Sequence, residues 1–205
     1  MRRARLALLL CLLLGCSSES DRHRDDDDDD DRSSKKKKDE PAPPDPLETL
    51  MAIPTLVGAI DATKKTMSDE VDDLSGGAVA LAVWAAEKMR WSELSGIPES
   101  GYGLIMKDPD AERGKRLCGT GEIIEIEAEK TDFGKVFRGG MFAGGIDKVF
   151  RFLAVGSTGD LVAHSRAKFC GIVIGKESYS NSMGGMTHGV SLVGMFDLPA
   201  NRVYP

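Results

Sequence analysis

The chain has 205 residues, of which 27 are Lys or Arg and 33 are Asp or Glu, so its formal net charge is −6. This balance excludes a generally basic nucleic-acid-binding protein. Apolar residues make up 41% of the chain, which is a globular composition diluted by a polar segment, and the length predicts one folded domain with a tail.

The first residues combine a basic start with a short apolar run. Arg2, Arg3 and Arg5 are positively charged, and residues 6–14 (LALLLCLLL) are apolar. A membrane-spanning helix needs roughly 20 apolar residues, so this run is too short to cross a bilayer. A basic stretch followed by a short apolar run is typical of a signal peptide, which the sequence predicts for residues 1–15.

The apolar run ends in Leu13, Leu14, Gly15 and Cys16. This motif resembles the lipobox of bacterial lipoproteins, in which the cysteine thiol is alkylated with diacylglycerol and cleavage occurs before the cysteine. The resemblance implies lipidation of Cys16 and a location in the cell envelope, held to the membrane by lipid. By analogy with enterobacterial lipoproteins, Ser17 directs the protein to the outer membrane, facing the periplasm or the cell surface. The alternatives are a secretory peptide cleaved elsewhere and a chance apolar start.

Residues 16–46 are strongly charged and nearly devoid of apolar side chains. Seven consecutive Asp residues (25–31) are followed by four Lys residues (35–38) and a proline-rich end, PAPPDP. Such a composition cannot bury enough apolar surface to fold, so it predicts a disordered tether. Binding of a cation by the Asp run is the alternative, although this run lacks the spaced ligands of a calcium loop. The Lys block is a further candidate, for contact with anionic headgroups.

Residues 47–113 are rich in Ala, Leu and Met, which favours helices. A first helix is expected over 48–67, bent or restarted at Pro54. A second is expected from Ser68, interrupted by the glycines at 76 and 77. The apolar stretch 78–86 indicates a buried helix, and a turn-rich connector follows.

Residues 114–205 contain short apolar runs bounded by glycines, which predict strands. The five expected strands are 115–127, 136–143, 148–155, 167–176 and 188–196. An insertion between the third and fourth, 157–167, is long enough for a short helix. This layout resembles the OB-fold, a small partly open Greek-key barrel. The predicted fold class is therefore α+β: an N-terminal helical segment followed by a five-stranded OB-like β-barrel. A five-stranded sandwich and an SH3-like barrel have the same strand count.

Two cysteines remain once Cys11 leaves with the signal peptide and Cys16 is lipidated. Thiols of exported domains usually pair. In an OB-fold the first strand lies beside the fourth, so the resemblance implies a disulfide between Cys118 and Cys170. Two free buried thiols, or a zinc site with His164 or His188, are the alternatives.

The sequence carries none of the common catalytic signatures GxSxG, HExxH, GxxxxGK[ST] or CxxC. A Ser/His/Asp arrangement can be assembled from His164, Asp160 and Ser165, or from His188 and its loop. Almost any set of polar loops contains such a combination, so it does not indicate catalysis. The sequence therefore predicts a protein that is not an enzyme, with no catalytic residue, metal or cofactor.

OB-folds bind through the face of strands two and three and through two adjoining loops. On that basis the candidate binding residues are Phe137, Arg151, Tyr179, Asn181 and His188. Strand alternation places Phe150 and Phe152 together, filling the barrel, and Arg151 on the opposite face. The expected function is a non-catalytic binding or structural module whose partners are the membrane, through the lipid anchor, and an envelope protein or glycan. Nucleic acid is not an expected partner. A single-stranded nucleic-acid-binding OB-fold and an extracytoplasmic hydrolase are the alternatives.

Overall fold

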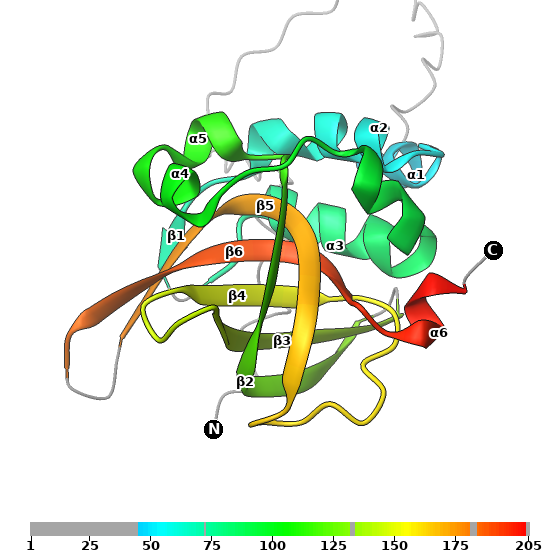
Figure 1. Ribbon diagram of the computed structural model, residues 1–205. Helices are drawn as coiled ribbons and strands as arrows, with labels where there is room; N and C mark the ends of the chain where they lie inside the picture. The colour runs from blue at the N-terminus through cyan, green and yellow to red at the C-terminus, as the bar shows by residue number, and fades with distance from the viewer. Residues whose placement is uncertain (1–44, 72, 132–133, 181–183, 204–205) are drawn as a thin grey trace, which may run out of the picture. The chain divides into compact units, whose positions relative to one another are not determined.

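The computed structural model describes residues 45–71, 73–131, 134–180 and 184–203 (Figure 1). The predicted signal peptide, Cys16, the tether up to residue 44, and Asn181 lie outside the described residues. All described residues belong to one unit, residues 43–205.

The unit combines short helices with a six-stranded sheet. The helices are α1 (Pro46–Met51), α2 (Leu56–Thr63), α3 (Gly76–Lys88), α4 (Tyr102–Lys107), α5 (Pro109–Glu112) and α6 (Pro199–Arg202), with 3₁₀ turns η2 (Lys64–Thr66) and η3 (Trp91–Gly96). The strands are β1 (Glu70–Val71), β2 (Arg116–Thr131), β3 (Gly134–Ala143), β4 (Val149–Ala154), β5 (Arg166–Ser180) and β6 (Met186–Phe196). The predicted α+β class is confirmed. Within the described residues no helix has the length and hydropathy needed to cross a membrane.

The expected break at Pro54 is present between α1 and α2, but the elements that follow α2 differ from the prediction. The expected helix from Ser68 is wrong, because residues 70–71 form β1, which pairs parallel with β5. Helix α3 begins at the glycine pair instead of being interrupted by it, and the Ser75 hydroxyl caps it by accepting from the Ala78 amide. Gly77 lies so close to η2 that a Cβ there would be 2.6 Å from the Met67 nitrogen, so this contact requires glycine.

The five long strands pair in a closed ring but do not form a clear barrel. Antiparallel ladders join β2 to β3, β3 to β4, β2 to β5 and β5 to β6, and a parallel ladder joins β4 to β6. The ring follows the order β2, β3, β4, β6, β5 and back to β2. Strands β5 and β6 continue into the segment expected to be a loop, and Ser178 pairs with His188 there. The short helix expected at 157–167 is wrong; its described residues form turns and the start of β5.

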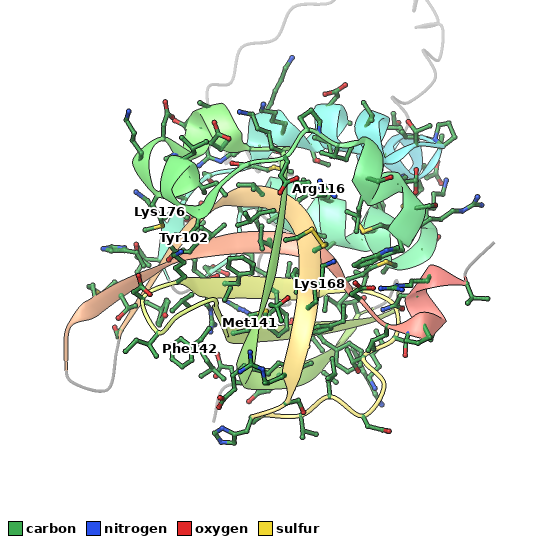
Figure 2. All side chains as sticks on the ribbon, in the orientation of Figure 1. Tyr102, Arg116, Met141, Phe142, Lys168 and Lys176 are labelled. Carbon is green, nitrogen blue, oxygen red and sulfur yellow. A yellow bond between two sulfur atoms is a disulfide. The ribbon has the colours of Figure 1, made fainter. Side chains whose placement is uncertain are left out.

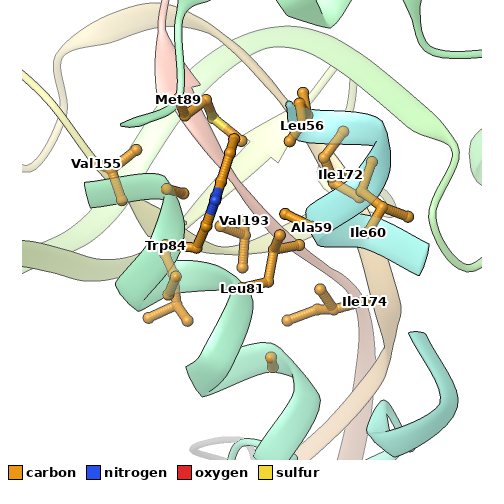
Figure 3. Packing of buried hydrophobic residues seen from close by; sticks show 14 of the residues in the cluster. Leu56, Ala59, Ile60, Leu81, Trp84, Met89, Val155, Ile172, Ile174 and Val193 are labelled. Atoms are coloured by element: carbon orange, nitrogen blue, oxygen red, sulfur yellow. The ribbon is translucent and has the colours of Figure 1, made fainter. Parts of the chain in front are cut away.

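Two apolar cores lie on the two faces of the strands. The first lies between the helices and the outer face of the ring, where Leu81 and Trp84 of α3 pack near Ile172 and Val193 (Figure 3). The second lies inside the ring, where the rings of Phe152, Phe169 and Phe196 contact one another at centroid distances of 5.1 to 5.3 Å. Phe150 belongs to the second core as well, as expected from strand alternation.

The predicted disulfide between Cys118 and Cys170 is confirmed. The two residues are direct partners in the β2–β5 ladder, with Cα atoms 4.1 Å apart. Cys170 belongs to the first core and Cys118 packs against it. The alternatives of free thiols and a zinc pair are therefore wrong.

Candidate functional site

Arg151 occupies the middle of β4, on the outer face of the ring. Its ladder neighbours are small, Gly140 on β3 and Ser191 on β6. A Cβ at Gly140 would lie 3.1 Å from Arg151 Nη1, and a Cβ at Gly189 would lie 3.3 Å from Arg151 Cγ. The missing side chains therefore leave room for Arg151 to lie flat across the neighbouring strands.

Two β-bulges turn carboxylates toward Arg151. One register shift lies between Ile123 and Glu125 on β2, and the other between Val173 and Gly175 on β5. Ile123 and Val173 point into the second core. An extra residue reverses the alternation that follows it, so Glu125 and Glu177 come to the outer face, where both pair with Arg151.

The resulting charge cluster consists of Arg138, Arg151, Glu125 and Glu177. The Glu177 side chain is only 4% exposed, and its Oε1 lies 3.2 Å from Arg138 Nη2 and 3.4 Å from Arg151 Nε. The Ser191 hydroxyl donates to Glu177 Oε2. Burial alone would lower the pKa of Arg151, but the hydrogen bond and charge of Glu125 and the charge of Glu177 raise it above the usual value.

Tyr179 borders this cluster, and Tyr102 lies near the start of β4, the strand that carries Arg151. The Tyr179 ring lies 5.2 Å from the Arg151 guanidinium carbon, a cation–π contact. Tyr102 of α4 lies beside the start of β4 (Figure 2), where its hydroxyl accepts from the Val149 amide. Burial raises the pKa of both Tyr102 and Tyr179, so both hydroxyls remain protonated donors at neutral pH.

Two narrow hollows adjoin the cluster. The first is lined by Leu74, both arginines, Glu177 and Ser191, among others, and has no room for a water molecule. The second shares Leu74, Glu177 and Ser191, extends toward Glu70 and is scarcely larger. The cluster therefore lies in a closely packed part of the surface.

Of the four predicted binding residues that the structure describes, Arg151 and Tyr179 lie together. His188 bonds to Ser178 at 2.8 Å between Nδ1 and Oγ, on the other face of the β5–β6 hairpin. Phe137 packs against the second core, with Lys135 Nζ 4.6 Å from its ring centroid. Asn181 lies outside the described residues.

Arg138, Glu125 and Glu177 are the members of the cluster that the predicted binding residues do not include. Simple alternation from the inward-facing Ile123 and Val173 would place Glu125 and Glu177 on the inner face, and the bulges that turn them outward leave no periodic signal. The pairing of Glu177 with Ser191 in the hollow likewise depends on strands that are distant in the sequence.

The polar groups elsewhere include small charge networks, such as Asp197 with Lys168 and Arg202, and isolated pairs. His164 Nδ1 lies 2.9 Å from Glu122 Oε1, and the Ser165 hydroxyl accepts from the Val162 amide. Across the described ranges, no three His, Cys, Asp or Glu residues are grouped to hold a metal ion. Both arginines of the Arg151 cluster stay charged, because a guanidinium is not deprotonated in proteins. Together with the two carboxylates they supply charged hydrogen-bonding groups.

Comparison with protein-family models and with curated proteins finds no match for this chain.

Proposed function

We propose that this chain is a lipid-anchored lipoprotein of the cell envelope whose folded unit is a non-catalytic, OB-like binding module. The observation that carries the proposal is the Cys118–Cys170 disulfide, because structural disulfides persist in exported proteins and are rare in the cytosol. It agrees with the export and lipidation suggested by residues 1–16, which include the lipobox-like motif at Leu13 to Cys16.

The order of strand pairing supports the OB-like part of the proposal. The first long strand, β2, pairs with the fourth, β5, as the OB-fold resemblance implies. The third and fifth long strands, β4 and β6, run parallel and close the ring of pairings. A Greek-key arrangement of five strands of this kind presents its outer face and its end loops to a ligand.

The partner is an envelope protein or a glycan bound over Arg151 and Tyr179. Charged and aromatic side chains on a rigid sheet are well suited to such binding, since little conformational freedom is lost. The protonated Tyr179 hydroxyl and the half-exposed Glu125 carboxylate offer a donor and an acceptor at the same place. These groups match the hydroxyls of a sugar or the polar groups of a protein surface.

Two experiments test the proposal. Cys16→Ser removes the proposed lipid attachment, so the protein leaves the membrane fraction of the host while the parent chain stays in it. Photo-cross-linking in native membranes then captures a partner that Tyr179→Ala loses and His164→Ala, at an exposed position outside the cluster, retains. Identical captured species with both variants would contradict a binding role for this face.

A further inference from the structure

Strand β2 has a long edge that no other strand in the described part of the chain covers. Its ladder with β5 ends at Glu122, and the last backbone bonds on that side join Ile123 to Ser165 and His164. Beyond this point Ile124 is the extra residue of the bulge, and Glu125 to Lys130 pair with β3 on one side only. No described residue bonds to the backbone of this stretch on the other side. Seven residues of strand span roughly 24 Å of unpaired backbone donors and acceptors.

The outer face of this edge carries two carboxylates without a counter-ion. Glu125 is engaged by Arg151, whereas Glu127 and Glu129 form no ion pair with any described residue. Arg138 lies directly opposite Glu127 in the ladder, but its guanidinium turns to the buried Glu177 instead. Two carboxylates without an ion-pair partner among the described residues therefore lie two residues apart along the edge.

The inner face of the same edge is apolar for part of its length. Ile126 packs against the second core, and Ala128 is exposed opposite Phe137, which also packs on that core. An added strand would therefore meet carboxylates on one face and apolar side chains on the other. This alternation gives the edge a chemical specificity as well as free hydrogen-bonding groups.

A second copy of this chain does not match the edge. Antiparallel pairing of two β2 edges centred on Glu127 would set Glu125 opposite Glu129 and Glu127 opposite itself, and like charges directly opposite destabilise a sheet. The acidic row thus works against self-association, as charged side chains do on natural edge strands. It leaves the edge open to a strand of the opposite charge.

We propose that the β2 edge from Ile124 to Lys130 binds an extended protein segment in which Lys or Arg alternates with apolar residues, by addition of a strand to the sheet. The basic side chains face Glu127 and Glu129, and the apolar ones continue the face of Ile126 and Ala128. This surface adjoins the Arg151 cluster at Glu125, but its binding groups are the free backbone of the edge and the carboxylates of Glu127 and Glu129, and binding there does not depend on the lipid anchor.

The test uses the full chain and a fluorescent seven-residue peptide of alternating lysine and valine, followed by anisotropy. We expect saturable binding that weakens at least tenfold for the variant Glu127→Lys/Glu129→Lys. The matched control Glu48→Lys/Glu87→Lys makes the same charge change at exposed helix positions and keeps the parent affinity. The same peptide with glutamate in place of lysine should bind the reversed-edge variant better than the parent chain.

A second probe separates strand addition from simple charge attraction. N-methylation of alternate peptide nitrogens removes the donors on one edge but keeps every charge, and we expect it to abolish binding when the methylated edge is the one that pairs. Equal affinity for the methylated and unmethylated peptides, with either edge modified, would overturn the proposal. So would absence of binding by the lysine peptide, or equal loss of affinity in the two charge variants.

Discussion

Removal of the Cys118–Cys170 disulfide should destabilise the fold by an amount that the structure sets. The bridge joins residues 52 positions apart in the sequence. In the chain-entropy relation, closing a loop of that length in the unfolded state is worth about 4 kcal/mol at 25 °C. This is a large part of the 5–15 kcal/mol typical of a whole domain.

The perturbation is Cys118→Ala/Cys170→Ala, compared with the parent chain in urea with and without a thiol reductant. For a chain of this size a slope of about 2 kcal/mol per molar urea is expected, so the unfolding midpoint should fall by about 2 M. The reductant should produce a similar loss in the parent chain and no change in the double variant. A loss below about 1 kcal/mol, or a parent chain insensitive to reductant after complete reduction, would contradict a stabilising role for this disulfide.

Three further predictions concern the charge cluster, one glycine and the end of β6. Arg151→Met should lower the free energy of unfolding in urea by about 2 to 3 kcal/mol, because it removes one of two cations from the buried Glu177. Adding Glu177→Leu should recover most of that loss. Unchanged stability in the single variant would contradict the pairing of Arg151 with Glu177. Gly121→Ala should lower the free energy of unfolding by at least about 2 kcal/mol, because a Cβ there would collide with the Phe142 carbonyl oxygen. The control Gly103→Ala, where α4 leaves open space for a Cβ, should be neutral or stabilising. Equal thermal midpoints for the two variants would be inconsistent with this packing. The hydrogen bond of Arg202, aided by Lys168, lowers the pKa of Asp197 below its ordinary value of 3.8. The stability that this carboxylate contributes is therefore present above that value and lost as the pH falls through the folded-state pKa. Asp197→Asn should lower the thermal midpoint at pH 7 and lose its effect once the pH is below the folded-state pKa. A pH-independent difference would exclude this linkage.

Much of the β-sheet follows from local sequence signals. Runs such as residues 148–155 and 188–196 combine β-branched and aromatic side chains between glycines, and the structure has strands at both. The pairing of Cys118 with Cys170 followed from the resemblance to a fold in which the first and fourth strands are neighbours. Local composition and a fold-level rule were sufficient for these features.

The features that sequence reasoning missed depend on contacts between distant residues. Strand β1 has only two residues, and it exists because it pairs with β5 more than 100 residues later. The glycines at 76 and 77 are weak helix formers by propensity, yet α3 starts there because η2 packs against Gly77. The pairing of Glu125 and Glu177 with Arg151 depends on two β-bulges, and the alternation of residues along the strands does not indicate where these bulges lie.

The most direct test of the central claim is the intact mass of the full chain purified from membranes of its native host, measured without reduction. We expect a chain that begins at Cys16, carries a diacylglycerol and an acyl group on that residue, and holds Cys118 and Cys170 in a disulfide. An unmodified chain that still begins at Met1, with both of those thiols free, would contradict it.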